Sequence, residues 1–373
     1  MRKVKFRDKL ILYLFFAILV LPSIIWWFIS PNLPFEYIDV LQAKKFPEFN
    51  IITVKEIPKE FDSYYFGNLP FRVYCLRFYS YVLYKLTGNI ESSKVLFGKA
   101  GWLFYCDKTD GDPVADYKKI NQFTNEELVK ISKNLTALQL YCKKRNCDFV
   151  FLIGPNKENI YPEYMPDNII RTNYTSRTKQ LVNYLKANTN IKVIDPTSDL
   201  IEAKKDDFVY YKCDTHWNDL GGYVASKLLL DNFGLNLPNC SVLKKEQEYN
   251  EDNIYDLADM TGMRKKALFF ETNEIRISGY TNLQVEKRPS IVKDEIRMYC
   301  QNAPKKEKIM ILRDSFAKYM IPVVSAYYQD SVYYMYAYFY KELVDIEKPN
   351  LLVFEVVERC FPRLMNYDFE EKN

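Results

Sequence analysis

Helix and strand patterns alternate along the chain from about residue 94 onward. A capping-box pattern, Thr124 followed by Glu127, opens a helix through about residue 145, and a second helix is expected at about 174–188. Short apolar runs without polar alternation, typical of strands buried on both faces, occupy residues 147–154, 191–196, 308–316 and 349–360. This order predicts an α/β fold whose parallel sheet is covered by helices on both faces.

Other segments fit around this framework. Alternating apolar residues around residues 98–101 suggest a hairpin, and residues 218–233 are expected to form a helix that Asn218 caps. Residues 240–306 are charged and irregular, and we interpret them as an insertion. The predicted main domain is therefore 94–373, with an insertion at about 240–306.

The N-terminal residues follow a different pattern. Residues 1–9 carry five basic side chains and one acid, and residues 10–29 contain no charge. Such a run is long enough for a transmembrane helix, and the basic flank predicts a cytoplasmic N-terminus with the rest of the chain extracytoplasmic. A cleaved signal peptide is the alternative. We therefore expect a cytoplasmic tail and membrane anchor at 1–30 and a stalk at 31–93.

Charge and cysteine content limit the function. Removing the five basic and one acidic residue of the tail from totals of 52 and 48 leaves 47 of each, so the remaining chain is neutral and a nucleic-acid partner is not expected. Eight cysteines, an even number beyond the anchor, permit disulfides in any pairing. No C-x-x-C pair occurs and the chain has one histidine, so we expect no metal site.

That single histidine, His216, stands in the stretch YYKCDTHWNDLGGY at residues 210–223. In an extended segment, side chains two residues apart point to the same side, so Asp214 would lie beside His216. The carboxylate could then fix the imidazole tautomer and leave one ring nitrogen free as a base. A histidine that merely packs or hydrogen-bonds locally is the alternative.

A nucleophile is offered by Ser315, in the stretch KIMILRDSF at the end of a buried strand. Ligand sites of α/β sheets lie outside the carboxyl ends of the strands, and a helix start supplies N–H groups for an oxyanion. The N–H group of Ser315 itself is the expected oxyanion donor. Asp314 or Ser315 could instead simply cap the helix that follows.

Several motifs together resemble the SGNH-type domain of the alginate O-acetyltransferase family, AlgX and AlgJ, and the related DHHW proteins. They are GKAGWLFY (98–105), GPNKENIYPEYMP (154–166), YKCDTHWNDLGGY (211–223), YDLADM (255–260), ILRDSF (311–316) and PNLLVFEVVERC (349–360). The Asp-His pair precedes the serine, as in this family. The resemblance implies an SGNH-hydrolase-like, doubly wound sheet and a catalytic triad of Ser315, His216 and Asp214.

The resemblance also implies an activity and partners. Such a protein transfers an acetyl group through a serine acyl-enzyme to hydroxyls of a cell-envelope or secreted polysaccharide, without a cofactor. A multipass membrane O-acyltransferase would supply the acyl group. Asn156, Lys157 and Arg359, which follow strand ends, are the candidate substrate-binding residues, and a surface or loop-stabilising role is the alternative for each. Two alternatives stay open: a carbohydrate esterase with the same triad, and a non-catalytic envelope scaffold.

Overall fold

We describe the fold from a computed structural model. It describes residues 6–29, 57–67, 72–87, 92–250, 253–261, 269–291 and 294–369. The chain divides into two compact units, Met1–Ile90 and Glu91–Asn373. The described residues of the first unit form the helices α1 (Phe6–Ile29), α2 (Ile57–Gly67) and α3 (Arg72–Thr87).

Helix α1 covers the apolar run that the sequence assigns to a membrane anchor. Among the helices of the described residues, however, none is found to be both long and apolar enough to cross a membrane. The predicted transmembrane helix is therefore not supported.

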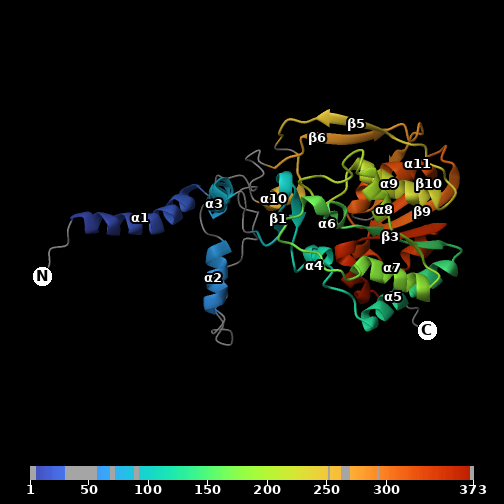
Figure 1. Ribbon diagram of the computed structural model, residues 1–373, viewed down its shortest axis with the longest axis horizontal. Helices are drawn as coiled ribbons and strands as arrows, with labels where there is room; N and C mark the ends of the chain where they lie inside the picture. The colour runs from blue at the N-terminus through green and yellow to red at the C-terminus, as the bar shows by residue number, and fades with distance from the viewer. Residues whose placement is uncertain are drawn as a thin grey trace. The chain divides into compact units, whose positions relative to one another are not determined.

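The second unit is built on a seven-stranded sheet (Figure 1). Its strands run in the spatial order β4-β3-β11-β9-β10-β8-β7. Their bounds are β3 (Asp148–Gly154), β4 (Lys192–Ile194), β7 (Glu286–Arg288), β8 (Ile296–Tyr299), β9 (Lys305–Arg313), β10 (Tyr328–Met335) and β11 (Leu351–Val357). The buried runs predicted as strands are thus confirmed as neighbours in one sheet.

The sheet is mixed, which corrects the expectation of a fully parallel one. Strands β4, β3, β11, β9 and β10 are parallel neighbours, but β8 pairs antiparallel with β10, and β7 pairs antiparallel with β8. Strands β7 and β8, at one end of the sheet, both come from the segment interpreted as an insertion. They are short and partly exposed, so their pattern lacks the continuous apolar run that identifies the central strands.

Helices cover both faces of the sheet (Figure 1). One face is covered by α5 (Asn125–Lys143) and α7 (Arg177–Asn188), and the other by α8 (Thr197–Ala203), α9 (Asp219–Asp231) and α11 (Ile321–Tyr327). The predicted caps are confirmed: Thr124 and Glu127 form a capping box at α5, and the Asn218 side chain accepts a hydrogen bond from Gly221 N at α9.

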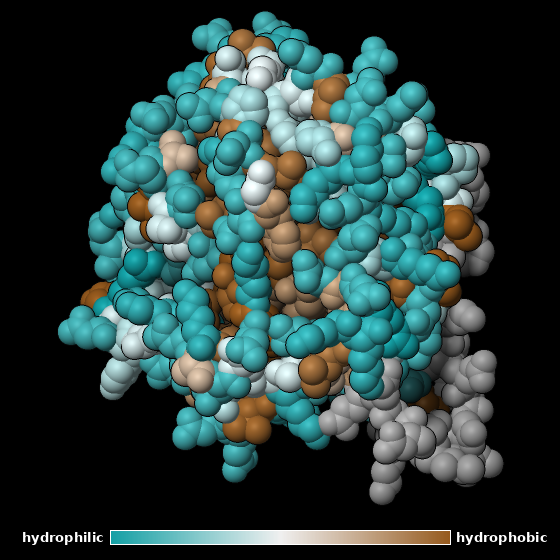
Figure 2. Space-filling model, turned by 90° about the vertical axis from the view of Figure 1, so that its right-hand side faces the viewer, coloured by the Kyte–Doolittle hydropathy of each residue, from teal (hydrophilic) through white to brown (hydrophobic). Residues whose placement is uncertain are grey.

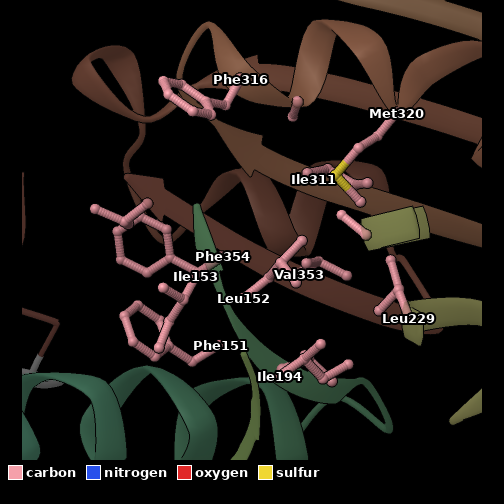
Figure 3. Packing of buried hydrophobic residues seen from close by; sticks show 14 of the residues in the cluster. Phe151, Leu152, Ile153, Ile194, Leu229, Ile311, Phe316, Met320, Val353 and Phe354 are labelled. Atoms are coloured by element: carbon pink, nitrogen blue, oxygen red, sulfur yellow. The ribbon is translucent and has the colours of Figure 1, made fainter. Parts of the chain in front are cut away.

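The core lies between these layers. Phe151 and Phe354 are paired across β3 and β11 and point with Ile153 toward one face, whereas Val353 and Ile311 point toward the other (Figure 3). All of these side chains are fully buried. Burying an aliphatic or aromatic side chain of this size stabilises the fold by about 1.5–3 kcal/mol.

Smaller elements complete the unit. The hairpin predicted near residues 98–101 is confirmed as β1 (Val95–Phe97) and β2 (Leu103–Tyr105), and β5 (Ser241–Glu246) pairs antiparallel with β6 (Asn273–Ser278). The remaining helices are α4 (Pro113–Lys118), α6 (Lys157–Ile160), α10 (Asp256–Met260) and α12 (Leu343–Glu347). The face in Figure 2 is mostly polar, with apolar side chains gathered in a central band.

The described cysteines are free thiols, and the side chains of Cys142 and Cys147 contact each other. The seven cysteines whose side chains the structure describes are all free, namely Cys106, Cys142, Cys147, Cys213, Cys240, Cys300 and Cys360. Cys142 and Cys147 stand at the end of α5, where Cys147 N donates a hydrogen bond to Cys142 O at 3.1 Å. The disulfide pairing that the even count permits is therefore not formed among the described cysteines.

Candidate active site

Ser315 stands at the carboxyl end of β9, the central strand of the sheet, as the sequence predicts. It begins a 3-10 turn, Phe316–Tyr319, with an unstrained helical backbone, and its side chain is exposed. The preceding Asp314 anchors this turn, because its carboxylate accepts hydrogen bonds from Phe316 N and Val357 N, both at 2.8 Å. We call residues 314–319 the nucleophile turn.

His216 lies in a tight loop between α8 and α9. Tyr210 and Trp217 form an isolated antiparallel bridge, and Tyr211 N donates to His216 O at 3.2 Å, so residues 210–217 close on themselves. We call these residues the histidine loop. Its Trp217 is fully buried, and the indole N–H donates to Phe316 O at 2.7 Å, which ties the loop directly to the nucleophile turn.

The three residues predicted as a triad lie within hydrogen-bond distance in the expected order. His216 Nε2 is 2.6 Å from Ser315 Oγ, and His216 Nδ1 is 2.6 Å from Asp214 Oδ1. Asp214 also accepts from His216 N at 2.9 Å through the same oxygen. This geometry suits a serine hydroxyl whose proton can pass to an oriented imidazole.

The charge of Asp214 decides which ring nitrogen carries the proton. Burial opposes its ionisation, but the hydrogen bonds and charge of His216, together with Asp256 N, hold the pKa of Asp214 below its ordinary value. The carboxylate is therefore ionised at neutral pH and can only accept a hydrogen bond. Nδ1 then carries the proton, and Nε2 is left free to accept the Ser315 proton.

A second acid, Asp256, was missed by the sequence analysis. Its backbone N–H donates to Asp214 Oδ2 at 2.9 Å, and its carboxylate accepts from Thr215 N at 2.7 Å and from the Thr215 hydroxyl. Its Oδ2 also lies 3.7 Å from His216 Nδ1. Burial and the negative charge of Asp214 raise the pKa of Asp256. The available signal was YDLADM at residues 255–260, which had been assigned to an irregular insertion.

Asp214, His216 and Asp256 could also be considered as metal ligands, since one donor atom of each lies within 4.8 Å of the others. The donor set of two carboxylates and an imidazole suits several divalent metals. Here the same atoms already have hydrogen-bond partners within the histidine loop. We therefore assign the cluster to orientation of the imidazole.

Lys157, predicted to bind substrate, points into the protein. Its ammonium is 2 % exposed and donates to three carbonyls of the histidine loop: Asp214 O at 2.7 Å, and Tyr211 O and Lys212 O at 3.2 Å each. These bonds use all three ammonium protons. Burial lowers the pKa of Lys157, because it disfavours the charged ammonium. Its contacts therefore position the loop and leave no proton for a substrate.

Whereas Lys157 binds carbonyl groups of the histidine loop, Glu271 binds a backbone N–H group of the same loop. Its carboxylate accepts a hydrogen bond from Cys213 N at 2.5 Å and is buried, and burial raises its pKa. The histidine loop is thus held by a buried cation on its carbonyls and a buried acid on an amide. Sequence reasoning had no signal for Glu271, because it lies far along the chain from the loop.

The other two predicted substrate-binding residues also have protein partners. Asn156 is buried, and its side chain donates to Asp116 at 3.0 Å and accepts from Arg359 N at 3.3 Å. The Arg359 guanidinium packs over the rings of Tyr105 and Phe316 and lies 3.8 Å from Asp110. Arg359 is thus beside the nucleophile turn, whereas Asn156 is inside the fold.

Glycine allows the two parts of the site to approach. A Cβ atom at Gly222, in α9, would lie 2.6 Å from both the Cβ and the carbonyl oxygen of Tyr319. No real side chain tolerates that distance to backbone. Gly222 therefore permits α9, which follows the histidine loop, to pack directly on the nucleophile turn.

Comparisons with known proteins agree with this architecture. A DHHW family protein from Eubacterium siraeum shares the fold, with a TM-score of 0.53 and 11% identity over 76% of this chain and 98% of that chain. The O-acetyltransferase domain of Pseudomonas putida AlgJ matches at a TM-score of 0.48 and 15% identity, over 73% and 99%. Bacillus cereus PatB1 matches with a TM-score of 0.49 and 15% identity, over 74% of this chain and 99% of that chain.

Curated proteins give no match to the chain. A family model does: residues 95–270 match the SGNH hydrolase-like domain of the acetyltransferase AlgX. The matched range contains Asp214, His216 and Asp256 and ends before Ser315, so the place of Ser315 in the site rests on geometry. Residues 95–270, just under half of the chain, are thus similar to the SGNH hydrolase-like domain of the acetyltransferase AlgX.

Proposed function

We propose that this protein is a polysaccharide O-acetyltransferase that works through an acetyl-enzyme on Ser315. The observation that carries the proposal is the continuous relay of two 2.6 Å contacts from Ser315 Oγ through His216 to Asp214. The match of residues 95–270 to the SGNH hydrolase-like domain of the acetyltransferase AlgX supports the reaction class. The substrate and the covalent mechanism are our inference.

In the first half-reaction, Ser315 Oγ attacks the carbonyl carbon of an acetyl donor while its proton passes to His216 Nε2. The Ser315 N–H group is the donor we expect at the oxyanion of the tetrahedral intermediate. Collapse of the tetrahedral intermediate breaks the bond to the leaving group, which takes the proton from Nε2. The acetyl group stays on Oγ. Asp214 stabilises the transient imidazolium.

The second half-reaction reverses these roles. A sugar hydroxyl gives its proton to His216 Nε2 and attacks the acetyl carbonyl. The bond to Ser315 Oγ then breaks, Oγ recovers the proton, and the acetyl ester leaves on the sugar. No electron transfer is required, because both steps are acyl substitutions.

A carbohydrate esterase is the second candidate. The exposure of Ser315 favours it, since an open nucleophile lets water replace the sugar hydroxyl in the second step. The predicted acyl-donor partner, a multipass membrane O-acyltransferase, and the extracytoplasmic location stay predictions that rest on the resemblance and on the basic N-terminus.

The test is to incubate the full chain with a chromogenic acetyl ester and to measure its intact mass. We expect one acetyl adduct on Ser315 and its transfer to added oligosaccharide. Ser315→Ala should lose the adduct, whereas Ser198→Ala, at an exposed serine of α8, should keep it. An adduct released only as acetate would favour the esterase. The absence of any adduct would refute the proposed chemistry and favour the scaffold.

A further inference from the structure

We propose that a small pocket beside His216 binds one uncharged sugar unit of the acceptor, and that it disfavours a uronate. The proposal rests on the proposed function and adds the chemical class of the acceptor. The pocket has a volume of about 210 Å³ and is lined by Tyr211, Asp214, Gln247, Asn253, Ile254, Tyr255, Glu274 and Tyr319. Typical sites for drug-sized ligands start at about 300 Å³, so this one suits a single ring.

The pocket is continuous with the catalytic residues. Asp214, the partner of His216, forms part of its wall, and Tyr319 follows Ser315 by one turn of chain. The centres of the Tyr319 ring and the imidazole are 6.2 Å apart. A sugar held here would therefore lie against Asp214 and Tyr319, and a hydroxyl that extends past Tyr319 would reach toward the imidazole.

The pocket presents aromatic faces. The ring of Tyr211 lies 5.7 Å from that of Tyr319 and 6.0 Å from that of Tyr255, centre to centre, so three tilted rings form one wall. Tyrosine offers a flat apolar face and a polar tip. Such faces pack against the C–H groups of a pyranose ring and leave its hydroxyls directed outward.

Amide and carboxylate groups form the rest of the wall. Gln247 Oε1 accepts from Asn253 Nδ2 at 3.1 Å and from the Tyr255 hydroxyl at 3.2 Å, which fixes these side chains relative to one another. The site thus combines a few oriented polar groups with apolar faces, as small-ligand pockets do. Hydroxyls, which both donate and accept, match this set of groups.

The charges argue against an anionic sugar. Asp214 and Glu274 are both carboxylates, and none of the residues lining the pocket is basic. The nearest arginine, Arg276, is paired with Glu274 and lies 3.4 Å from Asp219, so two acids already compensate its charge. Lys318 lies over the Tyr319 ring, with its ammonium 5.7 Å from the ring centre, but it does not line the pocket. A uronate carboxylate inside the pocket would therefore face like charge without a counter-ion on the lining. A neutral hexose or acetylated amino sugar would not.

The experiment compares two acceptors on the full chain, an N-acetylglucosamine tetrasaccharide and a mannuronate tetrasaccharide. With a chromogenic acetyl ester as donor, we measure transfer to sugar relative to hydrolysis. We expect the neutral acceptor to be favoured by about tenfold. Glu274→Gln should raise transfer to the uronate severalfold, whereas Glu286→Gln, which removes an exposed acid of β7, should leave the preference unchanged. A preference for the uronate would overturn the proposal, as would equal transfer to the uronate by Glu274→Gln and Glu286→Gln.

A binding measurement separates this proposal from the proposed function. Ser315→Ala cannot form an acetyl-enzyme, so calorimetric titration of this variant with the same two tetrasaccharides tests the pocket without chemistry. Tighter binding of the neutral sugar that is weakened by Tyr255→Ala would support the pocket even if no acetyl-enzyme forms. Equal binding of both sugars, or binding unaffected by Tyr255→Ala, would refute it whether or not acetyl transfer is observed.

Discussion

The nucleophile turn and the histidine loop meet at one site but are held in different ways. The turn leaves the central strand β9, and the backbone of β11 fixes it through Val357 N and Asp314. The loop runs between the helices α8 and α9. Apart from a hydrogen bond from Leu103 N of β2 to Lys212 O, its backbone is held chiefly by the buried charged side chains Lys157 and Glu271. One half of the site is thus positioned by the sheet, and the other by side chains from distant segments.

This difference separates effects on chemistry from effects on loop position. Removing a group that reacts should abolish activity and leave the fold intact. Removing a group that holds the histidine loop should reduce activity and stability together, because buried carbonyls and amides lose their partners. Substitutions in the sheet-held turn should have smaller effects when they preserve its hydrogen bonds.

The largest effect is expected for His216→Asn. In the proposed mechanism this residue supplies the base, so acetyl-enzyme formation should fall on the order of 10⁴- to 10⁶-fold, as when a triad member is removed. The asparagine is half-exposed and close in shape, so the melting temperature should change little. Burst kinetics with a chromogenic ester and thermal unfolding check both outcomes. Activity near that of the native chain would refute the triad.

Next in size is Lys157→Met, which keeps the apolar stem but removes the ammonium. Asp214 O and Tyr211 O lose the ammonium as donor, whereas Lys212 O keeps the hydrogen bond from Leu103 N, and each unsatisfied group costs about 1–3 kcal/mol. The relief of a buried charge offsets part of that cost. We expect a lower melting temperature and a fall in kcat on the order of 10²-fold.

The matched control for this variant is Lys143→Met, which removes an exposed lysine of α5. It should change neither the kcat nor the melting temperature measurably. If Lys157→Met behaved like this control, the histidine loop would not depend on buried charge, and the contrast between the two halves of the site would disappear.

Asp256→Asn should have a smaller effect. The backbone N–H that supports Asp214 remains, and the amide oxygen can still accept from Thr215 N, but the bond to the Thr215 hydroxyl is weakened. We expect kcat to fall about tenfold with little change in KM, since one orienting contact is lost. Steady-state kinetics check this split. A change in KM alone would instead assign Asp256 to substrate binding.

These residues show what the sequence could and could not predict. Asp214, His216 and Ser315 could be found because the first two are local neighbours and the third follows a continuous apolar run. Lys157 was found, but the sequence left substrate binding and loop support as alternatives, because its position after a strand end does not reveal where a long side chain points. Asp256 was missed because its partner lies about forty residues away, a contact that only tertiary folding creates.

The charge dependence of the loop should also appear in acid. Asp214 has a folded-state pKa below the ordinary 3.8, so its ionisation adds stability above that value, and this stability is lost as pH falls through the lower folded-state pKa. The stability advantage of the native chain over Asp214→Asn should therefore shrink between pH 5 and pH 3. Urea unfolding of both proteins at pH 5 and at pH 3 measures this difference in the free energy of unfolding. A constant difference would mean that Asp214 gains nothing from its partners.

The smallest effect is expected in the sheet-held turn, at Glu355 of β11. This residue is fully buried and accepts a hydrogen bond from Asp314 N at 3.0 Å. Burial and the adjacent Asp314 charge raise its pKa well above the ordinary value, which favours its neutral form. Glu355→Gln keeps the shape, the acceptor and the neutral state, and should change stability by less than about 1 kcal/mol.

Glu355→Ala is the contrasting variant, because it leaves Asp314 N without its acceptor and opens a cavity beside Gly154. It should cost about 2–4 kcal/mol in urea unfolding. If Glu355→Gln cost as much as Glu355→Ala, Glu355 would act as a charge. The nucleophile turn would then depend on buried ionisation in the same way as the histidine loop, and the two halves of the site would share one mode of support.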